Sequence, residues 1–202
     1  MEQAFVRRRT STGAYLCKVL VDVDRMMEGG EACEKRRQID GARMFYRAAI
    51  EALDALLETR IVLERHERAQ GLMGRLAYRE LDIETAIPYL EEQCRSHEHL
   101  YGGNTVALLE AYVMLCQAYS RQKRVLEARD TAKKAAEITA KLGDYCSAYC
   151  IYAHFWVRMF EHELGNFEAA EAALVSCLAL IDAHPELLSP AETAMIRGLA
   201  SK

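Results

Sequence analysis

The sequence predicts an all-α protein built as an α-solenoid, a superhelix of stacked helical hairpins. Three alanines, Ala86, Ala128 and Ala170, lie at a constant spacing of 42 residues, and their surroundings repeat with them. A fixed period of roughly 20 to 50 residues is typical of stacked repeat arrays. The composition agrees, because 3 prolines and 11 glycines in 202 residues leave little turn chemistry for a β fold.

The repeated positions have a packing logic. Small residues let the two helices of a hairpin approach closely, and large apolar residues fill the space beside them. The large residues stand three positions before the alanines, and further small or apolar residues stand four and eight positions after them. These three sets are Ile83, Val125 and Phe167; Leu90, Ala132 and Leu174; and Cys94, Ala136 and Leu178.

The first element expected is a flexible basic tail over residues 1–12, which contains Arg7-Arg8-Arg9. Modification of Thr10 or Ser11 stays open. An apolar helix is then expected over 15–27, ending where Glu28-Gly29-Gly30 supplies a helix break. A second helix is expected over about 31–58. Residues 13–60 are therefore interpreted as N-terminal helices, and the second of them carries a partial repeat.

The periodic part occupies residues 63–200. Its three hairpins are predicted over about 63–99, 104–141 and 145–182, with turn signals at Gly102-Gly103, Gly143 and Gly165. Ser189-Pro190 then has the pattern of a helix start, a cap followed by a proline in the first turn. We expect the resulting helix over 189–200 to cap the array, because a terminal repeat needs an outer face that tolerates water.

These hairpins resemble the tetratricopeptide repeat (TPR) family. The family pattern has a small residue early in the second helix, met by the three spaced alanines, and a large apolar residue three positions earlier. A late tyrosine in the first helix is met by Tyr119 but replaced by Ala77 and Glu161, and the turn glycine occurs only as Gly165. The long period and the Leu-Gly-type turns resemble the kinesin-light-chain variety. An upstream partial copy holds Ile39, Ala42, Tyr46 and Ala49.

A plain helical bundle is the alternative fold, but a bundle does not require the repeated period. The TPR resemblance implies that the first helix of each hairpin lines a concave groove. Carried over residue by residue, it implies a groove that is cationic at its N-terminal end and aromatic at its C-terminal end. The implied peptide-binding residues are Arg68, Arg75, Tyr78, Arg79, Gln117, Arg121, Tyr152, Phe155, Met159 and His162.

Such a groove suggests a protein–protein interaction adaptor or scaffold that binds an acidic and apolar peptide or helix of a partner. Arginine pairs with carboxylates, and buried aromatic residues supply much of the contact energy at interfaces. The positions of a chaperone-binding carboxylate clamp are not met, because only Arg75 among them is charged; they hold Gly71, Arg75, Met114, Tyr152 and Trp156. The alternative function is assembly into homo- or hetero-oligomers through the apolar helix over 15–27.

Other function classes find little support. A net charge of −4 and a pI near 5.9 argue against a nucleic-acid surface, and no apolar run has the length of a membrane span. The N-terminus lacks the apolar core of a secretory signal. The seven cysteines suit core positions in a reducing compartment, which favours a cytoplasmic protein.

No catalytic residue, cofactor or metal site is assigned. Cys146, Cys150 and His154 share one predicted helix stripe, but two helical turns separate the outer pair by about 12 Å, too far for one ion. Cys94, His97 and His99 lie near a helix C-terminus, where the helix dipole favours histidine. No nucleotide-binding or hydrolase motif occurs.

Overall fold

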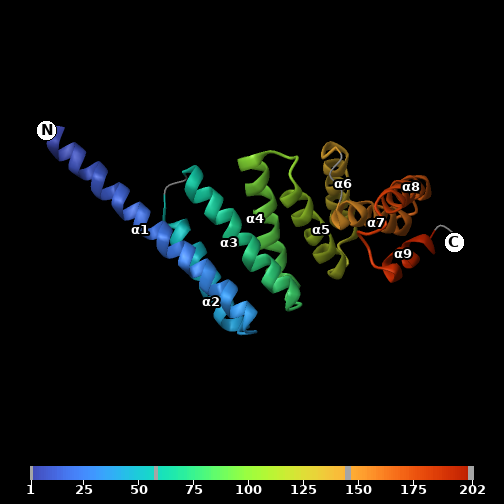
Figure 1. The fold of residues 1–202 in the computed structure, drawn as a ribbon, viewed down its shortest axis with the longest axis horizontal. Helices are drawn as coiled ribbons and strands as arrows, with labels where there is room; N and C mark the ends of the chain where they lie inside the picture. The colour runs from blue at the N-terminus through green and yellow to red at the C-terminus, as the bar shows by residue number, and fades with distance from the viewer. Residues whose placement is uncertain (1, 57–58, 144–146, 200–202) are drawn as a thin grey trace. The chain divides into compact units, whose positions relative to one another are not determined.

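The computed structural model describes residues 2–56, 59–143 and 147–199, with side chains from residue 14 onward. Over these residues the chain is helical and contains no strand, which confirms the predicted all-α class (Figure 1). The helices are α1 (Glu2–Lys35), α2 (Ile39–Asp54), α3 (Arg60–Arg79), α4 (Ile83–Tyr101), α5 (Val106–Arg121), α6 (Val125–Lys141), α7 (Ala148–Glu163), α8 (Phe167–Ala183) and α9 (Pro190–Arg197).

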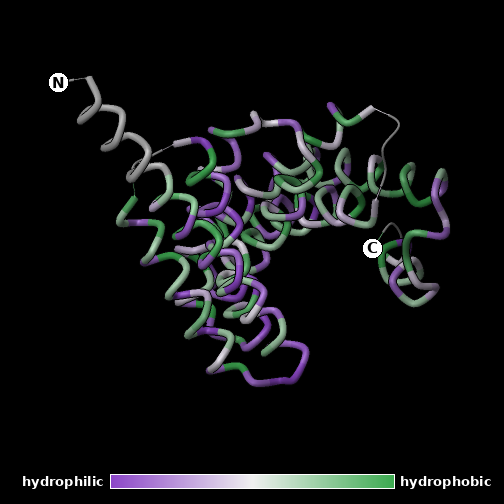
Figure 2. Tube along the Cα trace, turned by 60° about the vertical axis from the view of Figure 1, so that its left-hand side comes forward, coloured by the Kyte–Doolittle hydropathy of each residue, from purple (hydrophilic) through white to green (hydrophobic). Residues whose placement is uncertain are grey.

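The chain forms two compact units, residues 1–96 and 97–202. The first unit contains α1, α2, α3 and most of α4, and its core joins apolar residues of α1, α2 and α3, such as Met27, Leu53 and Met73. The second unit has an apolar cluster between α7, α8 and α9, which includes Ile151 and Ile181. Polar and apolar stretches alternate along the helices (Figure 2), as expected where one face of each helix is buried.

Four helix–helix turns share one backbone conformation. Their central residues, Arg37, Leu81, Lys123 and Gly165, have positive φ angles of 57°, 62°, 59° and 79°. The next N–H in each turn donates to a carbonyl five residues earlier. These bonds are Gln38 to Cys33 (2.9 Å), Asp82 to Ala77 (3.0 Å), Arg124 to Tyr119 (3.0 Å) and Asn166 to Glu161 (2.8 Å). This pattern is the Schellman helix end, which positions the second helix of each hairpin.

A buried alanine follows every one of these turns. Ala42, Ala86, Ala128 and Ala170 are at most 3% exposed, and each N–H donates to the carbonyl four residues earlier. The three alanines that set the sequence period therefore have a fourth equivalent in α2. Helices α1 and α2 form a complete hairpin, where the sequence predicted only a partial repeat.

The helix break predicted at Gly29-Gly30 is wrong. Helix α1 runs through both glycines to Lys35, and the chain turns at residues 36–38. A Cβ at Gly30 would overlap the ring of Tyr46 on α2, so the glycine permits close packing of two helices rather than a turn. The helix expected over 31–58 is consequently replaced by the end of α1 and by the shorter α2.

Helix α1 is much longer than its hairpin partner, with 34 residues against 16, and it projects past α2 in Figure 1. Its backbone begins at Glu2, within the segment predicted to be a basic tail. The side chains of residues 2–13 lie outside the described residues, and so does the prediction for Thr10 and Ser11.

The C-terminal helix α9 caps the second unit as expected. Ser189 accepts from the N–H of Glu192, and the Glu192 carboxylate accepts from the N–H of Ser189 at 2.8 Å, a capping box with Pro190 in the first turn. Ile196 of α9 is fully buried in the cluster of α7 and α8 residues. Among the described helices, none combines the length and the hydropathy needed to cross a bilayer.

Candidate functional site

Helix α3 carries the N-terminal cations of the predicted groove on one face. We call Arg68, Arg75 and Arg79 the α3 arginine face; they are spaced so that neighbours lie about one or two helical turns apart. The Arg68 guanidinium donates to Glu31 of α1 at 2.9 Å. Arg79 forms an ion pair with Glu34, which also lies on α1. Two of the three arginines are therefore already paired with carboxylates of the N-terminal helix.

Glu34 is the centre of a small polar network. Its side chain is 15% exposed, and it accepts a hydrogen bond from the Tyr46 hydroxyl in addition to the Arg79 pair. Burial raises the pKa of Tyr46 to about 12, and the nearby Glu31 carboxylate adds to the rise. Tyr46 therefore stays a neutral donor, and the network joins α1, α2 and α3.

Arg75 differs from its two neighbours. It is half-buried, and its guanidinium has no hydrogen bond or ion pair with any residue that the structure describes. Its positive charge acts on the Tyr46 hydroxyl and opposes the rise in that pKa, so Arg75 lies close to the polar network without joining it. Tyr78, on the same helix, is half-buried and has an interaction of its own.

The predicted groove residues of α5 and the start of α7 already have interaction partners within the chain. Gln117 and Arg121 both have interaction partners. The Tyr152 hydroxyl donates to Glu192 of α9 at 2.7 Å. Burial and this hydrogen bond raise the pKa of Tyr152 to about 12, while bonds from Ser189 and Tyr152 lower the pKa of Glu192 to about 2. Tyr152 is therefore bound to the capping helix.

The later α7 positions are apolar and partly exposed. Phe155 packs against the C-terminal cluster, with its ring edge-on to Trp156 at a centroid distance of 5.2 Å. Met159 is half-buried, and its sulfur accepts a weak contact from Arg158 at 3.6 Å. His162 is exposed and lies edge-on to Phe167 at 5.3 Å. The aromatic character expected for this helix is present within the second unit.

One position implied by the family resemblance does not line a surface. Gly71 is buried in α3, and a Cβ there would overlap the side chain of Gln93 on α4. Gly74, one turn later, would meet Leu90 at 2.9 Å. Both glycines therefore serve the close packing of α3 on α4, and Gly71 has no side chain to offer a ligand.

Sequence reasoning missed the α1 carboxylates and a hollow beside them. The hollow has a volume of about 400 Å³ and lies where α1 and α3 end and α2 begins. Its lining residues are Glu34, Arg37, Ile39, Leu76, Arg79 and Glu80. A signal was present, because Glu31 and Glu34 lie on the helix that precedes the first turn. Because a helix break was predicted at Gly29-Gly30, both glutamates were expected on the second helix, over about 31–58, and not on the first.

The described residues contain no group of three or more histidine, cysteine or acidic side chains that could hold a metal ion. Cys146 lies outside the described residues, so the stripe of Cys146, Cys150 and His154 is only partly seen. Cys116 and Cys177 are fully buried free thiols, and burial raises the pKa of each, that of Cys177 to about 12. Such protonated, enclosed thiols are poor nucleophiles.

Comparison with known proteins gives structural relatives only. No protein-family model matches the sequence. No curated protein matches it either. The structure is similar to the apo form of RapI, with a TM-score of 0.69 and 12% identity over 89% of this chain; it covers 52% of RapI, about half that protein's length.

Two further solved structures carry TPR repeats. The first holds TPR-like repeats of a protein designated a kinesin light chain from Podosopora anserina, with a TM-score of 0.63 and 13% identity over 83% of this chain and 77% of that one. The second is the C-terminal TPR-containing domain of an FK506-binding protein from Plasmodium falciparum, with a TM-score of 0.54 and 14% identity over 73% and 91%. With four matching turns and buried alanines, the chain has the TPR-like helical-hairpin fold of an α-solenoid.

Proposed function

We propose that this protein is a recognition scaffold that binds an acidic and apolar segment of a partner protein. The observation that carries the proposal is Arg75, a half-buried arginine with no carboxylate partner in the described part of the chain, between two arginines that each have one. Removing a cation from water has a cost that an opposite charge offsets. A partner carboxylate would supply the missing charge in a bidentate geometry.

The second unit carries apolar side chains of its own that suit contacts with a partner protein. Phe155 and Met159 are half-buried on α7, and His162 is exposed one turn beyond Met159. Aromatic and methionine side chains are enriched at protein interfaces, where they bury much area at a small entropic cost. Within the second unit, Phe155 and Met159 are proposed as apolar anchors, with the flanking contacts Gln117, Arg121, Tyr152 and His162. Within the first unit, Tyr78 is proposed as a flanking contact of the α3 arginine face. The free thiols suit a reducing compartment such as the cytoplasm.

Assembly through the N-terminal apolar helix has less support. Leu20, Val23 and Met27 of α1 are between 0% and 6% exposed, because they pack into the core of the first unit. A face that is buried within its own chain cannot also cover another copy without unfolding.

The test is affinity capture of partners from the native cell with the wild-type protein, with Arg75→Gln and with Arg75→Glu. Arg47→Glu serves as the matched control, because Arg47 is exposed on α2 and has no partner among the described residues. We expect both Arg75 variants to lose a partner that the control retains, and Arg75→Glu to lose more. Losing a charged hydrogen bond of about 1.5 to 3 kcal/mol weakens binding by roughly 10- to 100-fold. A partner set retained by both Arg75 variants would exclude the α3 arginine face.

A further inference from the structure

The hollow beside the α3 arginine face has the make-up of a side-chain pocket. Its floor is apolar, formed by Leu76, which is 1% exposed, and by the partly buried Ile39. Its rim is charged. A volume of about 400 Å³ exceeds that of a leucine or isoleucine side chain and lies within the range of roughly 300 to 1,000 Å³ that binding pockets occupy.

Some of the charged side chains at the rim have hydrogen-bond or ion-pair partners among the described residues, and others have none. Both oxygens of Glu34 accept, from Tyr46 and Arg79, so Glu34 and one edge of Arg79 are satisfied. Arg37 is exposed, and its guanidinium forms no ion pair or hydrogen bond with the described residues. Glu80 is exposed and likewise without a side-chain partner in the described part of the molecule. Arg75 is not among the lining residues, but it lies one helical turn before the lining residue Arg79 on α3, so a second unpaired cation stands near the hollow.

The turn at Arg37 places this side chain at the rim of the hollow. Arg37 has a φ of 57°, the left-handed conformation of the equivalent turn residues Leu81, Lys123 and Gly165. An arginine held there projects a charge at the rim of the hollow, which a glycine would not do.

We propose that the hollow receives an apolar side chain of the partner segment, and that a carboxylate flanking this side chain pairs with Arg37. A second carboxylate on the other flank reaches Arg75, and Glu80 accepts a main-chain N–H of the bound segment. The partner motif is therefore a leucine- or isoleucine-type residue between two acidic residues. This inference rests on the proposed function, because it identifies what an acidic and apolar partner presents.

The probe is a defined peptide, acetyl-Ser-Glu-Leu-Glu-Ser-amide, titrated into the full chain. Two matched peptides replace either the leucine by serine or both glutamates by glutamine. Methyl resonances of Ile39 and Leu76 in a ¹³C-labelled sample report entry into the hollow. We expect these methyl signals to shift with the first peptide. The affinity should fall about tenfold with the serine peptide, as for loss of one buried side chain, and about 100-fold with the glutamine peptide, as for loss of two charged contacts.

The variant Arg37→Gly separates binding from folding. It removes the rim charge while relaxing the left-handed turn, so we expect it to be at least as stable as the wild type and to bind the peptide about tenfold more weakly. Lys123→Gly makes the same change in the equivalent turn of the second unit and should leave the affinity unchanged.

The possible failures are distinguishable. Peptide binding that depends on Arg75 but leaves the Ile39 and Leu76 methyl signals unmoved, or that survives Arg37→Gly, overturns the pocket and leaves the proposed function standing. Equal binding of the leucine and serine peptides also overturns the pocket. An absence of binding by every acidic peptide overturns the pocket and the α3 arginine face together.

Discussion

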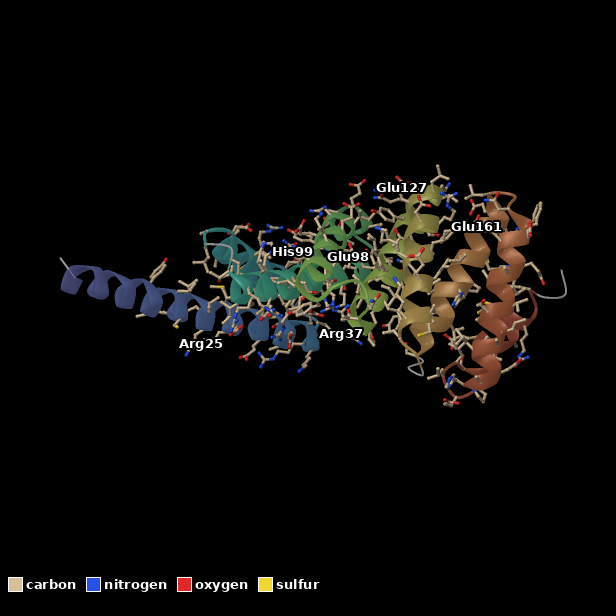
Figure 3. All side chains as sticks on the ribbon, turned by 90° about the horizontal axis from the view of Figure 1, so that it is seen from above. Arg25, Arg37, Glu98, His99, Glu127 and Glu161 are labelled. Carbon is tan, nitrogen blue, oxygen red and sulfur yellow. The ribbon has the colours of Figure 1, made fainter. Side chains whose placement is uncertain are left out.

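The first and the last hairpin use the same turn and stabilise it differently. In the last hairpin the left-handed position is Gly165, and the residue whose carbonyl closes the turn is Glu161, a buried acid (labelled in Figure 3). In the first hairpin these positions hold Arg37 and Cys33, and the helices are held close by a ring packed on a glycine. The comparison teaches that the repeat is defined by main-chain bonds and helix distance, while the supporting side chains are interchangeable.

Substitution at Gly30 breaks the first hairpin most strongly. A Cβ would overlap the ring of Tyr46, which is fully buried and cannot move away. We expect Gly30→Ala to lower the free energy of unfolding by about 2 to 3 kcal/mol, since the overpacking outweighs a gain of about 1 kcal/mol in helix propensity. The midpoint of urea unfolding, followed by far-UV circular dichroism, measures this loss of stability.

Gly29 is the matched control for that change. Its Cβ would lie 3.2 Å from the ring of Phe45, which is half-buried and has room to shift. The propensity gain then offsets the contact, so Gly29→Ala should change the unfolding free energy by no more than about 0.5 kcal/mol. Equal losses from Gly29→Ala and Gly30→Ala would contradict the role given to Tyr46.

Removal of Glu161 weakens the last hairpin. Its side chain is 1% exposed, pairs with Lys133 of α6 and accepts from Asn166 at 2.6 Å. We expect Glu161→Ala to cost about 1 to 2 kcal/mol, because Lys133 and Asn166 are solvent-accessible and regain hydration. Thermal unfolding measures the loss, and Glu163→Ala, at an exposed neighbour, should leave the midpoint unchanged.

The pH dependence of stability sharpens the same contrast. Burial raises the pKa of Glu161, but the hydrogen bonds from Lys133 and Asn166 outweigh it and hold the pKa below its ordinary value. The carboxylate therefore stabilises the fold fully above the unfolded pKa of about 4.3, and this contribution is lost as the pH falls through the folded value. The difference in urea midpoint between wild type and Glu161→Gln should be constant from about pH 7 to 5 and shrink below about pH 4.

The turn residues give the smallest effects. Leu81→Gly and Lys123→Gly relieve a left-handed residue, and the added freedom of glycine in the unfolded chain offsets part of the gain. We expect each to raise the unfolding free energy by about 0.5 to 1 kcal/mol, and Gly165→Ala to lower it by about 1 kcal/mol. Differential scanning calorimetry distinguishes these signs. A loss of stability in Lys123→Gly would show that the side chain, not the turn, matters there.

Much of the fold was readable in the sequence, because the spaced alanines report helix contact directly. The first hairpin was only partly recognised, since its turn residue is Arg37 and its two adjacent glycines look like a helix end. Glycine within a helix and glycine after one have the same local signature, and only the ring of Tyr46 distinguishes them.

The site was less readable than the fold. The sequence placed Arg68, Arg75 and Arg79 on one helix face, and the structure describes all three. That Glu31 pairs with Arg68, and Glu34 with Arg79, depends on contacts between residues more than 30 positions apart in the sequence. No local pattern encodes such pairing, so a paired and an unpaired arginine are distinguished only by the three-dimensional structure.

The recurrent left-handed turn has a consequence for how such chains diverge. A hairpin whose direction is set by carbonyl and amide groups asks little of residue identity beyond one small side chain per repeat. The other positions are then free to vary while the fold persists, in keeping with a similar fold in solved structures at 12% to 14% identity. Substitutions that change binding specificity can therefore accumulate at exposed positions of the hairpins without passing through an unstable intermediate.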